Sequence, residues 1–175
     1  GLIAARDTAI RRIEDLRGKR VTYVDRTSAS GFLFPLALAL DHGIDPHRDC
    51  LLFEPSGNHA DILYNLLQGR FDAGLVGDWL LREQAVGGEK LVRVIARTDS
   101  IPTPLFAVTR QFAGREPAAV NAIRAALFEM RETAAGREVF KQISGGSDGF
   151  VPAVDTDYAG VVPVRNTLRR HGYLE

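Results

Sequence analysis

Polar side chains that could bind an anion follow three runs of the sequence that each predict a β-strand. They are Thr27, Ser28 and Ser30 after residues 20–25, Ser56, Asn58 and His59 after residues 50–54, and Asp78, next to Gly77, after residues 71–76. Hydroxyl, amide and imidazole groups donate hydrogen bonds to a tetrahedral oxyanion without a permanent positive charge, which suits reversible binding. Each group also precedes a predicted helix, whose first backbone N–H groups lack an acceptor within the helix. The pattern therefore predicts an oxyanion site.

The same side chains can instead serve as helix N-caps, because Ser, Thr, Asn and Asp are favoured at that position. Asn58 followed by Asp61 resembles a capping box, and Asp78 directly before "WLL" can cap a helix by itself. His59 would then be an ordinary surface residue of a first helical turn. Capping explains the polar residues at any one of the three strand ends. Their occurrence at three consecutive strand ends favours a shared site.

The elements that must position these side chains alternate between strands and helices. Apolar and β-branched runs predict strands at residues 2–6, 20–25, 50–54, 71–76, 91–96 and 105–109. Helical spacing predicts a short turn at 13–16 and helices at 30–40, 62–67, from 79 onward, at 120–130, at 134–143 after Thr133 as N-cap, and from Pro163 to just before Gly172. Pro35 would lie too deep in a helix that begins at Ser30. Either the first turn is irregular or the regular helix begins nearer Pro35.

Strands that alternate with helices indicate a largely parallel sheet with helices on both faces. Ligands of such sheets bind beyond the carboxyl ends of the strands, where the helices begin. We therefore expect Ser28, His59 and Asp78 to meet around one ligand.

Composition narrows the class of protein. The 175 residues include 22 Lys and Arg and 22 Asp and Glu, so the formal net charge is zero and nucleic acid is not an expected partner. The single cysteine, Cys50, excludes an intramolecular disulfide and a cysteine zinc cluster. No apolar run approaches the roughly 18 residues that span a bilayer. Because the chain opens on Gly1 without a starting Met or a signal sequence, we expect that it has lost an N-terminal part.

Three segments together resemble one protein family, the periplasmic substrate-binding proteins of phosphate, phosphite and phosphonate ABC transporters. The segments are "IEDLRGKRVTYVDRTSASGFLFP", "SGNHADILYNLLQGRFDAGLVGD" and "ARTDSIPTPLFAV". Residues 25–35 match the family pattern D-x-x-S-x-S-G-[YF]-x-x-P, and residues 57–59 stand where the family has its G-S-H segment. The resemblance extends over nearly the whole chain.

The resemblance implies an α/β protein with the two-lobed type 2 periplasmic-binding-protein fold, built of mainly parallel sheets flanked by helices, with an incomplete first lobe. It assigns residues 19–104 to the anion-binding lobe. It assigns residues 1–18 and 105–175 to part of the other lobe with the hinge strands. The proline-flanked segment 97–104 suits a connector between lobes.

The resemblance also implies the ligand and the partners. It places Thr27, Ser28, Ala29 and Ser30 around the oxygens of a phosphonate, phosphite or phosphate, with His59 as a further donor and Asp78 near the organic substituent. A protein of this kind performs no chemistry, needs no cofactor or metal, and passes its ligand to an ABC transporter permease. It works in the periplasm or anchored on the outer side of the cytoplasmic membrane.

Two departures from the family bear on the ligand. Family members have further residues before the equivalent of Gly1, including part of the first lobe. Their connector often carries Asn-Asp, whose carboxylate can pair with a ligand amine, whereas here Thr103 stands between two prolines. The sequence thus favours phosphite, phosphate or methylphosphonate, although Asp78 could still receive an amine.

Two other functions fit parts of the pattern. The same architecture can be the ligand-sensing domain of a signalling protein that binds the same anions. A serine hydrolase could use Ser28, His59 and Asp78 as a triad. The sequence lacks the G-x-S-x-G elbow of such hydrolases, as well as H-E-x-x-H and G-x-x-x-x-G-K-[ST] motifs.

Overall fold

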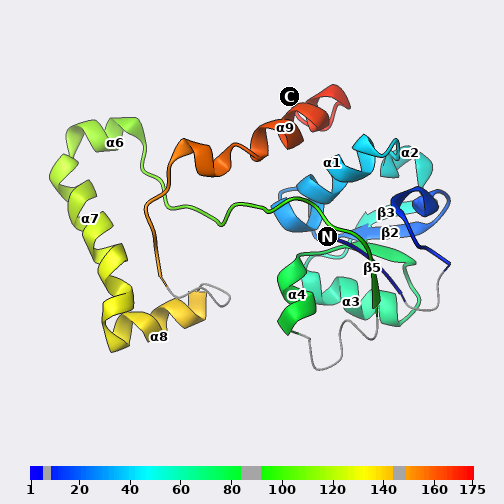
Figure 1. Cartoon of the computed structure of the whole chain (residues 1–175), viewed down its shortest axis with the longest axis horizontal. Coiled ribbons are helices and arrows are strands. Elements are labelled where there is room, and N and C mark those ends of the chain that lie inside the picture. The colour runs from blue at the N-terminus through cyan, green and yellow to red at the C-terminus, as the bar shows by residue number, and fades with distance from the viewer. Residues whose placement is uncertain (6–8, 84–91, 144–148) are drawn as a thin grey trace. The chain divides into compact units, whose positions relative to one another are not determined.

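The computed structural model describes residues 1–5, 9–83, 92–143 and 149–175 (Figure 1). These residues form two compact units, Gly1–Pro102 with Tyr158–Glu175, and Thr103–Asp157. The first boundary between the units falls inside the proline-flanked segment 97–104. The lobes implied by the resemblance are divided differently, at residues 18 and 104, and that division stays a prediction.

The first unit contains a five-stranded sheet. Its strands are β1 (Leu2–Ala5), β2 (Arg20–Tyr23), β3 (Leu52–Pro55), β4 (Ala73–Leu75) and β5 (Val92–Ala96), in the order β3-β2-β4-β1-β5. Strand β2 is parallel to β3 and β4, while β1 is antiparallel to β4 and β5. Four of the five described strands therefore run in the same direction, as expected of a mainly parallel sheet. The predicted strand residues 6 and 91 lie outside the described part of the chain.

Helices cover both faces of this sheet (Figure 1). One core packs α1 (Phe34–Asp41) and α9 (Val161–Arg170) against the sheet and includes the fully buried Leu36, Val21 and Leu168. The other core lies under α3 (His59–Leu67) and α4 (Asp78–Glu83), with Ile62 and Val76 at its centre. Two smaller helical segments, η1 (Ile13–Leu16) and α2 (Pro46–Asp49), complete the unit.

The helix after β2 begins irregularly, and Pro35 explains why. A π-helical turn, η2 (Ala29–Leu33), comes first, with the backbone N–H of Leu33 bonded to the carbonyl of Ser28 at 2.9 Å. The regular helix α1 then begins at Phe34, so Pro35 lies in its first turn, where the missing N–H costs nothing. Both expected outcomes therefore occur: the first turn is irregular, and the regular helix begins next to Pro35.

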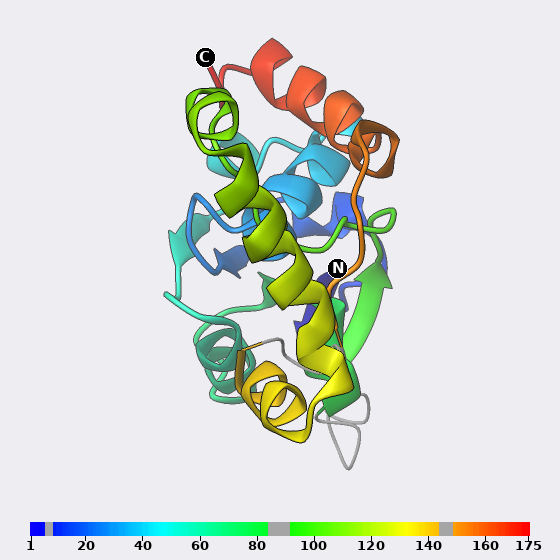
Figure 2. The same ribbon diagram turned by 90° about the vertical axis from the view of Figure 1, so that its left-hand side faces the viewer.

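The regular elements described in the second unit are all helical. It contains α6 (Arg110–Arg115), α7 (Pro117–Glu129), a 3-10 turn η3 (Met130–Glu132) and α8 (Ala134–Ile143). Figure 2 shows α7 as the long helix that joins α6 to α8. The side chain of Thr133 accepts a hydrogen bond from the backbone N–H of Gly136 at 3.0 Å, so it caps α8 as predicted. A further 3-10 turn, η4 (Asp155–Tyr158), lies at the unit boundary.

One predicted strand was wrong, and the start of one predicted helix was misplaced. Residues 105–109 form no strand, and Phe106 is 72% exposed. An apolar extended run becomes a strand only beside a partner strand, and none of the described residues offers one to it. Helix α9 begins at Val161, so Pro163 is its third residue rather than its first, although Gly172 follows its end with a φ of 75° as expected.

Candidate functional site

The three predicted strand ends lie at one edge of the sheet, because β2, β3 and β4 run in the same direction. Backbone hydrogen bonds join the segment after β3 to the segment after β2. The N–H of Ser56 donates to the carbonyl of Tyr23 at 2.7 Å, and the N–H of Gly57 donates to that of Val24 at 2.9 Å. The parallel arrangement thus holds the two segments side by side.

Hydroxyl groups after β2 are organised by a carboxylate and by the helix start. The backbone N–H and the hydroxyl of Thr27 both donate to Asp25 Oδ1, at 2.7 and 2.5 Å, and these bonds lower the pKa of Asp25. Ser28 Oγ accepts from the N–H of Gly31 at 3.1 Å, so Ser28 is an N-cap. Capping uses an acceptor lone pair, and a hydroxyl carries a donor hydrogen as well. The capping and anion-binding interpretations of Ser28 are therefore compatible.

Close packing fixes the conformation of this segment. A Cβ added to Gly31 would lie 2.3 Å from a methyl group of Val24 and 3.0 Å from Ser28 Oγ. Only glycine permits this approach between the helix start and the end of β2. Ser28 and Ser30 are half-buried, while Thr27 and Ala29 are exposed.

The His59 side chain connects the second strand end to the third. Its Nδ1 accepts a hydrogen bond from the backbone N–H of Gly77 at 3.0 Å. Partial burial lowers the pKa of His59, and the nearby carboxylate of Asp25 opposes this shift. In the neutral ring, a nitrogen that accepts an N–H leaves the hydrogen on the other nitrogen. Nε2 of His59 is therefore a hydrogen-bond donor.

Gly77 allows this contact because it has no side chain. A Cβ at this position would lie 2.5 Å from Nε1 of Trp79 and 3.3 Å from Cε1 of His59. The two rings meet edge to face with their centroids 5.2 Å apart. The glycine lets the His59 ring lie directly against the backbone after β4.

Asp78 begins α4 and is bonded to a side chain that the sequence analysis did not identify. Nη1 of Arg97 donates to Oδ1 of Asp78, and both side chains are about half exposed. Arg97 directly follows β5, which runs in the same direction as β4. Its place after a predicted strand was a signal that it lies at the same edge of the sheet.

The structure therefore brings His59, Gly77 and Asp78 together, and it ties the segment that carries Thr27, Ser28, Ala29 and Ser30 to them through the backbone of Val24 and Gly57. Within the described residues, no hydrogen bond joins Ser28 to His59 or to Asp78. A hydrolase triad requires histidine Nδ1 to donate to the carboxylate. Here Nδ1 accepts from a backbone N–H and the carboxylate pairs with Arg97, so these contacts do not form a triad.

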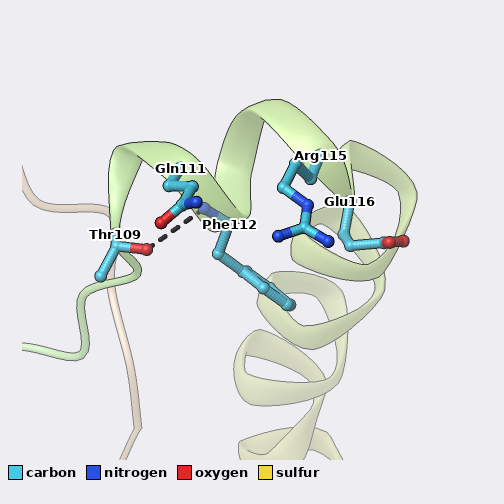
Figure 3. Close-up of a pocket in the computed structure, with 5 residues that line it drawn as sticks. All are labelled: Thr109, Gln111, Phe112, Arg115 and Glu116. Carbon is cyan, nitrogen blue, oxygen red and sulfur yellow. Dashed lines mark hydrogen bonds between the residues drawn. The ribbon is translucent and has the colours of Figure 1, made fainter.

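A pocket of about 320 Å³ lies elsewhere, in the second unit (Figure 3). It is lined by Thr109, Gln111, Phe112, Arg115 and Glu116. Oγ1 of Thr109 accepts from the backbone N–H of Phe112 at 3.1 Å, which is the N-cap contact of α6. The pocket includes none of the predicted site residues.

Neither a metal-binding cluster nor a membrane-spanning helix occurs in the described residues. No group of three or more His, Cys, Asp and Glu side chains among them could hold a metal ion. None of the helices in those residues combines the length and the apolar character needed to cross a membrane.

Comparisons with known proteins give one family. A family model described as "ABC transporter, phosphonate, periplasmic substrate-binding protein" matches residues 2–158. A search of curated protein sequences gave no match.

Solved structures of similar fold cover nearly the whole chain. XAC2383 from Xanthomonas citri bound to ATP has 19% identity and a TM-score of 0.74, over 99% of this chain and 67% of that one. PhnD1 from Prochlorococcus marinus in complex with methylphosphonate has 14% identity and a TM-score of 0.71, over 99% and 66%. The aliphatic sulphonate-binding protein SsuA from Escherichia coli has 14% identity and a TM-score of 0.62, over 99% and 60%.

These likenesses establish the fold and its extent. The chain has the α/β fold of type 2 periplasmic binding proteins. It spans only about 60 to 67% of the length of the three chains compared. These proteins are named for different ligands, so the shared fold does not identify the ligand of this chain.

Proposed function

Because the chain belongs to the family of periplasmic substrate-binding proteins of phosphonate ABC transporters, we propose that it captures a small phosphorus oxyanion. The ligand is a phosphonate, a phosphite or a phosphate, and the protein delivers it to the permease of the transporter. The complete protein works in the periplasm or anchored on the outer side of the cytoplasmic membrane. Proteins of this family bind and release their ligand without changing it.

The hydrogen bond between Gly77 and His59 carries this proposal. It leaves Nε2–H as the donor of a neutral imidazole, beside a segment with the hydroxyls of Ser28 and Ser30. The hydroxyl hydrogen of Thr27 is donated to Asp25, so an anion would have to compete with that carboxylate for it. The backbone N–H of Ala29 lies in the first turn of η2, where N–H groups lack an acceptor within the helix. Neutral donors of this kind hold the oxygens of a tetrahedral anion and release them readily.

The proposed site thus consists of Thr27, Ser28, Ala29, Ser30, His59 and Asp78. Asp78 is assigned to the organic substituent of a phosphonate, because it directly follows Gly77, the partner of His59. In the complete protein the anion lies between two lobes, one formed by residues 19–104 and the other including residues 1–18 and 105–175. This assignment of lobes is part of the proposal.

A thermal-shift screen tests the ligand class. Phosphate, phosphite and methylphosphonate should each be compared with sulfate and methanesulfonate, which have similar shapes but carry sulfur. A ligand at 100 times its dissociation constant stabilises the fold by about 2.7 kcal/mol. Stabilisation by phosphorus oxyanions and not by the sulfur compounds supports the proposal. Stabilisation by sulfate or methanesulfonate alone contradicts it, as does the absence of any shift.

A further inference from the structure

An ion pair stands at the edge of the sheet that carries the proposed site. Asp78 follows β4 and Arg97 follows β5, while β1 lies between these strands. Leu2 is paired with Leu75 on one side and with Ala96 on the other, and the backbone nitrogen of Gly1 donates to the carbonyl of Val76 at 2.8 Å. A single strand, β1, thus lies between the end of β4 and the end of β5. This spacing lets Arg97 reach across to Asp78.

The contact between the two side chains is direct. Nη1 of Arg97 donates to Oδ1 of Asp78, and their side chains are 50% and 42% exposed. A charged donor and a charged acceptor form a stronger hydrogen bond than neutral groups do. The negative charge of Asp78 is consequently balanced within the protein, before any ligand arrives.

The Arg97–Asp78 pair would affect how a ligand substituent near Asp78 is received. A ligand with an ammonium group would have to displace Arg97 from Asp78, and the guanidinium would repel it. A neutral substituent requires neither change. We propose that Arg97, by pairing with Asp78, makes the site discriminate against phosphonates that carry a cationic substituent and favour those with a neutral one. The inference rests on the proposed function, because it concerns the substituent of the same ligand.

Residues 102–104 read Pro-Thr-Pro and carry no carboxylate. Asp99, on the same connector, is exposed. Of the carboxylates near the proposed site, Asp25 lies close to His59 and is bonded to Thr27, while Asp78 is bonded to Arg97.

Two phosphonates of equal size test the inference. 2-Aminoethylphosphonate and n-propylphosphonate differ chiefly in the charge of the last group of the substituent. Titration calorimetry on the purified protein should give tighter binding of the propyl compound. Arg97→Gln frees the carboxylate of Asp78 and should shift the ratio of the two dissociation constants about tenfold toward the amine, as a new charged hydrogen bond would. The double variant Arg97→Gln with Asp78→Asn should lose that shift.

Arg12→Gln is the matched control, because Arg12 is also an exposed arginine paired with carboxylates, those of Glu14 and Asp15 in η1, which are not part of the proposed site. The ratio should stay within about twofold of the wild-type value in this variant. An unchanged ratio in Arg97→Gln, or a wild-type protein that prefers the amine, overturns the inference while the proposed function stands. A protein that binds neither phosphonate, and is not stabilised by phosphate or phosphite, overturns both.

Discussion

The backbone N–H of Gly77 donates to Nδ1 of His59 at 3.0 Å, and this contact between residues 18 positions apart joins the segments that follow two strands. The contact depends on the parallel directions of β2, β3 and β4, which bring their carboxyl ends to one edge of the sheet. It also determines the tautomer of the imidazole. A side chain on a first helical turn thereby becomes an oriented donor.

Replacing His59 tests this donor. His59→Ala should weaken binding of methylphosphonate by about 1–3 kcal/mol, the usual loss when a charged oxygen loses its hydrogen-bond partner. His59→Gln retains an N–H near the position of Nε2 and should lose less. Titration calorimetry at neutral pH measures both values. Equal affinity in the wild type and in His59→Ala would remove this side chain from the site.

Ser28 should show two separable effects when it is replaced by alanine. Loss of the N-cap should lower the free energy of unfolding by about 0.5–2 kcal/mol. Loss of the hydroxyl donor should weaken anion binding by about 1–3 kcal/mol. Denaturant unfolding measures the first effect, and calorimetry well below the midpoint of unfolding measures the second.

Thr109→Ala provides the control for Ser28, because Thr109 caps α6 by the same type of contact in the second unit. It should lower stability in the same range and leave the affinity unchanged. If Ser28→Ala behaves in the same way as Thr109→Ala, Ser28 is a cap and nothing more.

The pH dependence of stability should reveal the partly buried imidazole. Burial lowers the pKa of His59 from its ordinary 6.5, so the folded state holds fewer protons than the unfolded state between the two values. Its contribution to stability is fully present above pH 6.5 and is lost as the pH falls through the lowered pKa. Protonation of Nδ1 would also break its bond with the N–H of Gly77. The stability advantage of the wild type over His59→Gln should shrink from pH 7.5 to pH 5, as measured by denaturant unfolding. An advantage that grows on acidification contradicts this account.

Much of the arrangement could be predicted because it depends on local patterns. The apolar run of β2 and the glycine at residue 69, with a φ of 68°, mark an element and a helix end directly in the sequence. Thr133 was recognisable as a cap for the same reason. The parallel direction of the strands followed from their alternation with helices, and with it the shared edge at which Ser28 and His59 were expected.

The rest depended on partners distant in the sequence. Residues 105–109 have the composition of a strand, but strand formation requires a neighbour that composition does not reveal. Arg97 stands 19 residues beyond Asp78, and its pairing depends on the position of β1 between β4 and β5. The position of β1 between β4 and β5 cannot be predicted from the polarity of Asp78 or of Arg97.

Gly77 offers the sharpest test of how the site is built, because it contributes shape and a backbone N–H but no side chain. In Gly77→Ala the new methyl group would lie 2.5 Å from Nε1 of Trp79, so the indole must move, and the His59 ring with it. We expect a loss of about 1–3 kcal/mol in the free energy of unfolding, as for other overpacked positions. Binding of methylphosphonate should weaken as well, since the displaced imidazole no longer presents Nε2 in the same direction.

Gly114→Ala is the control: a Cβ there meets no atom within 4 Å, and alanine in α6 should stabilise the fold by about 0.5–1 kcal/mol. A Gly77→Ala protein that binds methylphosphonate as tightly as the wild type would show that the orientation of His59 by this glycine is not needed for binding.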